Sequence, residues 1–266
     1  MELSLLDDIR QQNPVVLNIS NFVTVQDVAN GINAIGASPI MSEEIAETEE
    51  MVGISQAVAL NLGAFSEPQV AHILKMGQTA NALHKPVIID PVAVGAVQYR
   101  KQVAEELMAQ FQVDVIRGNA GEIAALADIA WEAKGIDAGS GSGDLVAIAQ
   151  AAAQKHHCVV ILSGETDIIT DGQHVAKVFN GTPLFQLHVG SGDMLSSLVG
   201  AFCAVTTDYF EAAQTACLVF AAIGELVANK LEAEQPGTFS VRLMDGLHLT
   251  STDEIQKIAR FEVVDA

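Results

Sequence analysis

Basic residues are scarce in this sequence: 13 Lys or Arg stand against 33 Asp or Glu among 266 residues, a formal net charge of −20. Such a charge repels a polyanionic backbone, so nucleic acid is not an expected partner. A nucleotide substrate is compatible with it, because a bound cation, one or two Arg or Lys and backbone N–H groups can make a single site attractive to phosphate.

Cysteine is also scarce, and several common motifs are missing. Cys158, Cys203 and Cys217 lie in apolar stretches without C-x-x-C spacing, which disfavours a disulfide framework or a zinc site and predicts buried free thiols. No G-x-x-x-x-G-K-[ST] sequence occurs, which disfavours a P-loop NTPase. The first residues lack the regions of a signal peptide, and no apolar run has membrane-spanning length. We therefore expect a cytoplasmic protein without a membrane partner.

Apolar residues, by contrast, make up 50% of the chain and charged residues only 17%. This excess predicts that some apolar faces are buried between the subunits of an oligomer. The length suits one large α/β domain, and no repeat, low-complexity tract or linker divides the chain. We expect residues 1–266 to form a single domain.

Short apolar segments alternate with longer Ala-rich segments of helical period, which is typical of βαβ units. Fully apolar strands indicate a mainly parallel central sheet with helices on both faces. Ligands of such sheets bind at the carboxyl ends of the strands. The predicted strands are Val15–Ile19, Ala57–Leu62, Pro86–Asp90, Asp114–Arg117 and Cys158–Ser163.

The pattern changes in the last third of the chain. An Asn-Gly turn signal separates His174–Asn180 from Leu184–Val189, so the sequence predicts a hairpin there. Met194–Val205 and Glu211–Leu231 are rich in Ala, Leu and Val on most faces, which predicts buried helices.

The strongest local feature is the segment Gly190-Ser191-Gly192-Asp193, which precedes the first of these helices. Its glycines would let backbone N–H groups face an anion at the helix N-terminus. In phosphoryl transfer the four residues would form an anion hole, with Asp193 as a base beside the attacking hydroxyl. A Gly-rich turn with Asp193 as a helix N-cap fits the spacing equally well. In a second copy, Gly141-Ser142-Gly143-Asp144, we expect only a flexible loop and an N-cap.

Other polar residues lie at the ends of predicted strands. Asp90 and Arg117 each end an apolar segment, and Glu122 follows soon after Arg117. Carboxylates with room for water suit Mg²⁺, and an arginine suits a phosphate oxygen. Ser163 ends a further strand, and Ile168–Gly172 after it would be a loop at the edge of a nucleotide. Taken singly, these acids are more often cap or first-turn residues and the arginine the partner of a surface acid, so only co-location would make a site.

In their order along the chain these motifs resemble the hydroxyethylthiazole kinase family over nearly the whole sequence. The collinear order makes the resemblance far more specific than any single motif. The segments that carry it are Asn18–Asn21, Ala29–Gly31, Gly36–Met41, Asn61–Gly63, Asp90–Val92, Arg117–Ile123 and Ser163–Asp167.

The resemblance implies a ribokinase-like three-layer α/β fold and ATP-dependent phosphorylation of 4-methyl-5-(2-hydroxyethyl)thiazole in thiamin biosynthesis or salvage. It also implies Mg²⁺ as the cofactor, ATP as the co-substrate, and a homotrimer with sites at the subunit interfaces. The implied roles are thiazole binding for Asn21, Met41 and Gly190, ATP binding for Arg117 and Ser163, and metal binding for Asp90 and Glu122.

Three residues depart from the family pattern. Asp193 stands where members commonly carry Cys, although relatives elsewhere in the ribokinase-like class carry Asp as the catalytic base. Because a carboxylate is ionised at neutral pH and a thiol largely is not, Asp193 should be a competent base. Leu17 replaces a usual His, which leaves open whether the alcohol's pocket is altered, and Ser163 replaces a common Thr.

Alternatives to a thiazole kinase stay open at this point. One is a ribokinase-like kinase for a related small alcohol. Another is an ATP-dependent NAD(P)H-hydrate dehydratase, whose class also uses a Gly-x-Gly-Asp turn but fits the N-terminal segments poorly. A non-catalytic thiazole-binding protein would need Asn21 and Met41 but neither Asp193 nor the acidic pair.

Overall fold

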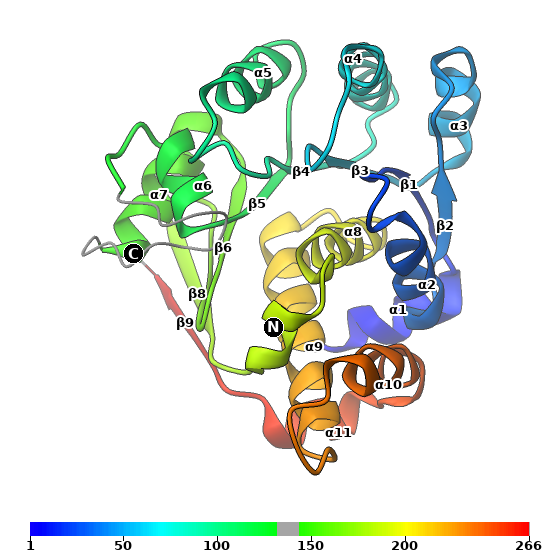
Figure 1. Ribbon diagram of the computed structural model, residues 1–266, viewed down its shortest axis with the longest axis vertical. Helices are drawn as coiled ribbons and strands as arrows, with labels where there is room; N and C mark the ends of the chain where they lie inside the picture. Colours follow the sequence, from blue (N-terminus) through cyan, green and yellow to red (C-terminus); the bar gives the residue numbers. More distant parts are fainter. Residues whose placement is uncertain (132–143, 266) are drawn as a thin grey trace.

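The computed structural model describes residues 1–131 and 144–265, whose strands form one nine-stranded sheet (Figure 1). In chain order these strands are β1 (Val15–Ile19), β2 (Ser38–Met41), β3 (Ala57–Asn61), β4 (Val87–Asp90), β5 (Val115–Asn119), β6 (Val159–Ser163), β7 (Asp167–Thr170), β8 (His174–Val178) and β9 (Phe261–Asp265). Their spatial order is β2-β1-β3-β4-β5-β6-β7-β8-β9. Pairing is parallel from β2 to β6 and antiparallel from β6 to β9, which confirms a mainly parallel sheet.

Helices cover both faces of this sheet, as the three-layer prediction requires (Figure 1). They are α1 (Ser4–Gln12), α2 (Val25–Ile35), α3 (Thr48–Ile54), α4 (Glu67–Ala82), α5 (Gln98–Met108), α6 (Ala120–Leu126), α7 (Leu145–His156), α8 (Ser191–Cys203), α9 (Tyr209–Ala228), α10 (Pro236–Leu249) and α11 (Thr252–Ile258), with short 3-10 helices η1 (Ile45–Glu47) and η2 (Pro183–Leu187). One apolar cluster joins the sheet to α1, α2 and α8 to α11, and a second joins it to α3 to α7.

Successive strand residues point to opposite faces, so each strand supplies both clusters. In β1, Val16 packs with the α8 face and Leu17 with the α4 face, and both are fully buried. The sequence left open whether Leu17 alters the pocket of the alcohol, and its burial on the α4 face answers that question. Asp193 lies on α8, across the sheet from Leu17, so Leu17 is a core residue of the other face.

Helices α8 and α9 form the centre of one layer, and their predicted burial is confirmed. All residues of α8 from Asp193 to Cys203 are buried. A Cβ on Gly200 would lie 3.1 Å from Val16 Cγ1, which shows how closely α8 lies on the sheet. Helix α9 is long and apolar enough to cross a membrane, but 78% of its apolar window is buried, as expected of a core helix. The three cysteines are buried free thiols, as predicted.

The predicted hairpin is wrong in its second half. His174–Val178 is a strand, but it pairs with β7 and β9, and the following segment forms η2. Pro183 starts η2, and Phe185 packs against the rings of Phe220 and Phe239. Tertiary packing of these aromatics thus outweighed the turn signal. The hairpin in this region joins β7 to β8, and β7 includes residues that the sequence suggested were a loop.

Candidate active site

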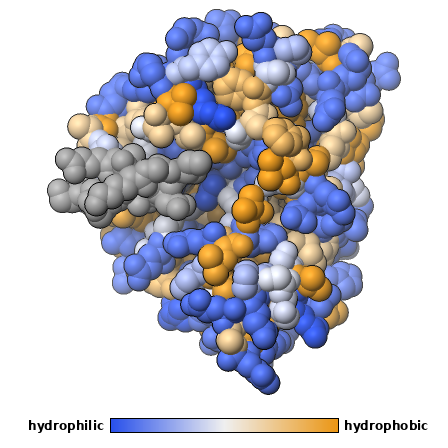
Figure 2. Space-filling model, in the orientation of Figure 1, coloured by the Kyte–Doolittle hydropathy of each residue, from blue (hydrophilic) through white to orange (hydrophobic). Residues whose placement is uncertain are grey.

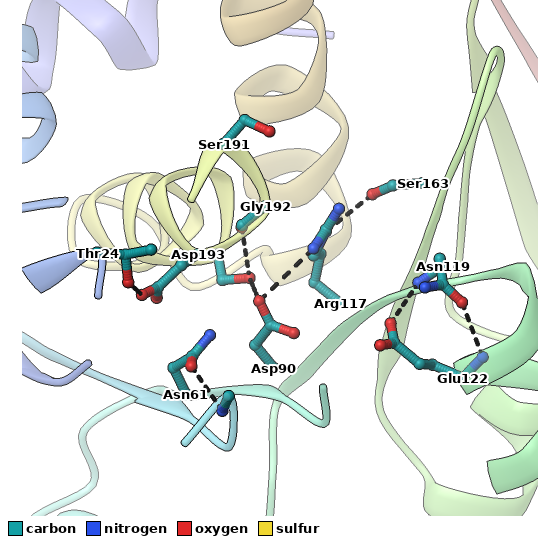
Figure 3. Close-up of polar contacts among 12 residues, drawn as sticks. Thr24, Asn61, Asp90, Arg117, Asn119, Glu122, Ser163, Ser191, Gly192 and Asp193 are labelled. Carbon is teal, nitrogen blue, oxygen red and sulfur yellow. Dashed lines mark hydrogen bonds and ion pairs between the residues drawn. The ribbon is translucent and has the colours of Figure 1, made fainter. Parts of the chain in front are cut away.

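Polar side chains gather at the carboxyl ends of four neighbouring parallel strands, β3 to β6. In each strand the residue two positions earlier packs into the cluster on the α8 face, so the polar residue points to that face as well. They are Asn61, Asp90, Arg117 and Ser163. Asp90 and Arg117, two of the residues whose co-location the sequence left as the condition for a site, therefore lie together with Ser163 beneath the N-terminus of α8 (Figure 3).

Asp90 and Arg117 form a buried ion pair. Arg117 Nη1 lies 3.5 Å from Asp90 Oδ2, and Ser196 Oγ of α8 donates to the same oxygen at 3.0 Å. Arg117 Nε donates to Ser163 Oγ at 2.9 Å, which fixes the guanidinium between two strand ends. Burial raises the pKa of Asp90, and the Arg117 charge opposes the rise. The other carboxylate oxygen, Asp90 Oδ1, is buried and makes no hydrogen bond of normal geometry among the described residues, although the Asn61 side chain lies close enough to lower the pKa of Asp90.

The N-terminus of α8 is built closely over this pair. Gly190 caps the helix with φ +96, a conformation that side chains rarely adopt. The amide of Ser191 donates to His188 O and its hydroxyl to Phe185 O, so this side chain points away from the cluster (Figure 3). A Cβ on Gly192 would lie 2.2 Å from Arg117 Nη1. The amides of Gly192 and Asp193, in the first turn, are thus the donors on which the predicted anion hole depends.

Asp193 is the third residue of α8 and is 5% exposed. Its Oδ2 accepts hydrogen bonds from Thr24 Oγ1 at 2.6 Å and from Asn21 Nδ2 at 3.4 Å. Burial and then the charge of Asp90 raise the pKa of Asp193 to about 7, against the effects of Thr24 and Arg117. The interpretation of Asp193 as the N-cap is wrong, because Gly190 holds that position.

Glu122 lies farther from α8 than the other acids. It is the third residue of α6 and is 5% exposed, with Oε1 accepting from the amide of Ala93 at 2.7 Å and Oε2 from that of Asn119 at 2.8 Å. It therefore ties together the segments that follow β4 and β5. Burial and the charge of Asp90 raise the pKa of Glu122 to about 7.

Asn21 and Met41, two residues expected to bind thiazole, lie on the side of Asp193 away from Arg117 and Ser163. Asn21 follows β1, and its Nδ2 donates to Asn61 Oδ1 at 3.1 Å. Met41 ends β2, pairs in register with Asn18 of β1, and is half-buried against the α8 face. The strand ends thus bring the predicted substrate-binding and catalytic residues to one edge of the sheet.

Sequence reasoning missed three contributors: Thr24, Asn61 and Ser196. Ser196 follows Asp193 by three positions, a spacing that places both on one side of a helix and was visible in the sequence. Asn61 is the penultimate residue of the predicted strand Ala57–Leu62 and ends β3 in the structure, so its position resembles that of Asp90. Thr24 had no comparable signal, because its contact with Asp193 joins residues 169 positions apart.

The second Gly-Ser-Gly-Asp copy is only partly covered. Residues 141–143 lie outside the described residues. Asp144 caps α7, its Oδ1 accepting from the amides of Val146 at 3.0 Å and Ala147 at 3.3 Å. The prediction of an N-cap is confirmed.

Comparison with known proteins identifies the family of this arrangement. The sequence model of the hydroxyethylthiazole kinase family matches residues 6–253. A hydroxyethylthiazole kinase of Levilactobacillus brevis is 70% identical over 262 residues, which cover 98% of this chain and 100% of that protein. The chain belongs to the hydroxyethylthiazole kinase family.

Solved structures agree with membership in the hydroxyethylthiazole kinase family. A hydroxyethylthiazole kinase of Pyrococcus horikoshii OT3 superimposes with a TM-score of 0.90 at 33% identity, covering 99% of this chain and 98% of the other. A ribokinase-like superfamily protein of Enterococcus faecalis, 14% identical, matches with a TM-score of 0.65 over 93% of this chain and 94% of the other. The predicted ribokinase-like fold, family and kinase class are confirmed.

Proposed function

We propose that the chain transfers the γ-phosphoryl group of ATP to the hydroxyethyl oxygen of 4-methyl-5-(2-hydroxyethyl)thiazole, in thiamin biosynthesis or salvage. The observation that carries this proposal is a buried carboxylate, Asp193, in the first turn of α8 beside Arg117 and Asp90. The alcohol oxygen forms a bond to the γ-phosphorus while the bond to the β–γ bridging oxygen breaks. ADP leaves with that electron pair, and the hydroxyl proton passes to Asp193.

The other site residues bind and orient the two substrates. Arg117 and Ser163 contact the phosphates of ATP. This role is supported by the position of the Arg117 guanidinium, which lies against Gly192 at the N-terminus of α8 and donates to Ser163 Oγ. The amides of Gly192 and Asp193 stabilise the charge on the transferring group. Asn21, Met41 and the backbone of Gly190 hold the thiazole.

The acidic residues fit a divalent cation, for which we propose Mg²⁺. Asp90 Oδ1 is buried without a hydrogen bond of normal geometry among the described residues, which is the property expected of a carboxylate oxygen that serves a metal. Both oxygens of Glu122 accept an amide N–H, so each keeps one lone pair for a bound water. Among the described residues, no three or more His, Cys, Asp or Glu side chains are grouped so that they could hold a metal ion by themselves. Mg²⁺ does not require such a group, because it is often held by one or two carboxylates with water and phosphate. When bound, Mg²⁺ neutralises phosphate charge.

A homotrimer with sites at its interfaces is part of the proposal. Apolar surface gathers across the middle of the face in Figure 2. Large exposed apolar side chains flank the site on the segments next to Asn21 and Gly190: Phe22, Val23, Leu187 and Val189. Light scattering on the purified protein should give three times the 28.0 kDa chain mass, and the chain mass alone would contradict the trimer. We further propose residues 1–266 as one domain and the cytoplasm as its location.

A coupled ADP-release assay with Mg-ATP and the thiazole alcohol, with the product mass measured, tests the proposed reaction. Gain of one phosphate on the thiazole is expected. Turnover only with another small alcohol would keep the mechanism and overturn the substrate. Turnover only with hydrated NADH, with phosphate released and no phosphorylated product, would replace the kinase with a dehydratase.

Activity should depend on pH through Asp193. A base must be deprotonated to act, and the pKa of Asp193 is raised to about 7, so kcat/KM for the alcohol should rise with pH and level off above about 7. Below this pKa the expected slope is about tenfold per pH unit. Initial rates at saturating Mg-ATP from pH 5.5 to 9 measure the profile. A profile that is flat between pH 5.5 and 7 would contradict Asp193 as the base.

A further inference from the structure

One side chain, that of Thr24, touches both ends of the Gly190–Asp193 turn. Thr24 lies just before α2 and is 4% exposed. Its hydroxyl donates to Asp193 Oδ2 at 2.6 Å (Figure 3). Its methyl packs on Gly190, since a Cβ added to that glycine would lie 2.6 Å from Thr24 Cγ2. The base and the backbone of the turn are therefore held by the same residue.

Thr24 is itself fixed by its own segment. Its amide donates to Asn21 O at 3.3 Å, and its carbonyl accepts the amide of Val28 at 3.0 Å as α2 begins. The side chain of Asn21 accepts the amide of Val23 at 3.0 Å, which closes the turn from β1 to α2. Helix α2 packs directly against α8. The hydroxyl of Thr24 thus approaches Asp193 from a rigid element.

A carboxylate needs such a partner to present one defined oxygen. Its terminal torsion is broad and roughly two-fold, so packing alone selects an orientation weakly. An O–H···O⁻ bond of 2.6 Å is within the range of strong charge-assisted hydrogen bonds. Thr24 and Asn21 both donate to Oδ2, so these two residues leave Oδ1 as the oxygen to receive a proton, and Ser20 is a further side-chain partner that lowers the pKa of Asp193.

We propose that Thr24 is a positioning residue for phosphoryl transfer, which holds the carboxylate of Asp193 with Oδ1 turned to the acceptor hydroxyl and supports the Gly190 backbone. This inference rests on the proposed role of Asp193 as the base. Thr24 is 4% exposed, so its hydroxyl is expected to act on the reaction through Asp193. Loss of the hydroxyl should therefore lower kcat and leave KM for ATP nearly unchanged.

Two substitutions separate the hydroxyl from the methyl. Thr24→Val keeps the branched shape and removes the donor, and we expect kcat to fall by about tenfold or more, with KM for ATP within about twofold. Thr24→Ser keeps the donor and removes the methyl, so its kcat should stay within about threefold of wild type while its melting temperature falls. Thr48→Val is a matched control, because Thr48 is equally buried and its hydroxyl donates to Ile45 O at 2.8 Å on the other face. It should lose stability and keep kcat.

A double-mutant cycle with Asp193→Asn decides the role, measured as ADP release with the thiazole alcohol and thermal unfolding of every variant. If Thr24 acts through the carboxylate, adding Thr24→Val to Asp193→Asn causes little further loss. Equal losses in both backgrounds, or a wild-type kcat in Thr24→Val, would overturn the inference. Failure of the proposed function shows separately, as no thiazole turnover by the wild type or as full turnover by Asp193→Asn.

Discussion

Replacing Asp193 by asparagine is expected to lower kcat by about 10²–10⁴-fold, the usual contribution of a general base. Asparagine has nearly the shape of aspartate, so α8 and the contact with Thr24 should persist, but the amide cannot take the hydroxyl proton. KM for ATP should change little, because Arg117 and Ser163 keep their positions. Steady-state kinetics with the thiazole alcohol measure the effect, and full turnover by the variant would contradict the base assignment.

The stability of this variant separates lost chemistry from lost folding. Burial raises the pKa of Asp193 from its ordinary value of 3.8 to about 7, so the folded protein binds the proton more tightly than the unfolded chain. The stability that this group contributes is present below its ordinary pKa and is lost as pH rises through about 7. Asparagine carries no charge at any pH. At pH 8 Asp193→Asn should therefore melt at or above the wild-type temperature.

A matched carboxylate at the amino ends of the strands, opposite to the site, provides the control. Asp114 precedes β5 at its amino end, its Oδ2 accepts the amide of Val87 at 2.8 Å, and burial raises its pKa. Asp114→Asn should shift stability with pH in the same direction and leave kcat at the wild-type value. Equal losses of kcat in Asp114→Asn and Asp193→Asn would indicate a general electrostatic effect in place of base catalysis.

Much of this site could be predicted because parallel strands end at one edge. Asp90, Arg117 and Ser163 each end an apolar run, and the parallel order of β4, β5 and β6 brings them together without further information. The period of two along each strand then places all three on the face of α8. The α/β class and the meeting of these residues at one end of the strands therefore follow from the pattern, whereas the ribokinase-like fold and the roles of the residues came from the family resemblance.

The contacts that orient these residues were not readable, because they depend on tertiary packing. Glu122 has a first-turn position that is ordinary for a surface acid, yet it is buried and tied to two backbone amides. Leu17 follows the strand pattern correctly, but its face could be assigned only once α8 was placed. The failed hairpin has the same cause: β8 takes as its second partner β9, which lies about eighty residues later in the chain.

Gly192→Ala is expected to lower kcat/KM for ATP by about 10²–10³-fold, comparable to removal of one donor from an oxyanion hole. The new Cβ would lie 2.2 Å from Arg117 Nη1 and 2.9 Å from its Cζ, so the guanidinium must leave its place between Asp90 and the helix. Alanine favours a helix over glycine, but the displaced guanidinium leaves the buried Asp90 carboxylate without its ion pair, so the melting temperature should fall together with activity.

The matched control for this substitution is Gly53→Ala on α3, where an added Cβ would meet no atom within 4 Å. Replacement of a helical glycine at such an open position should stabilise the protein by about 0.5–1 kcal/mol and leave all kinetic constants unchanged. Activity and thermal unfolding of both variants under identical conditions make the comparison. Full activity in Gly192→Ala would mean that Arg117 can bind ATP from another position. The close packing of α8 on Arg117 would then not be needed for catalysis.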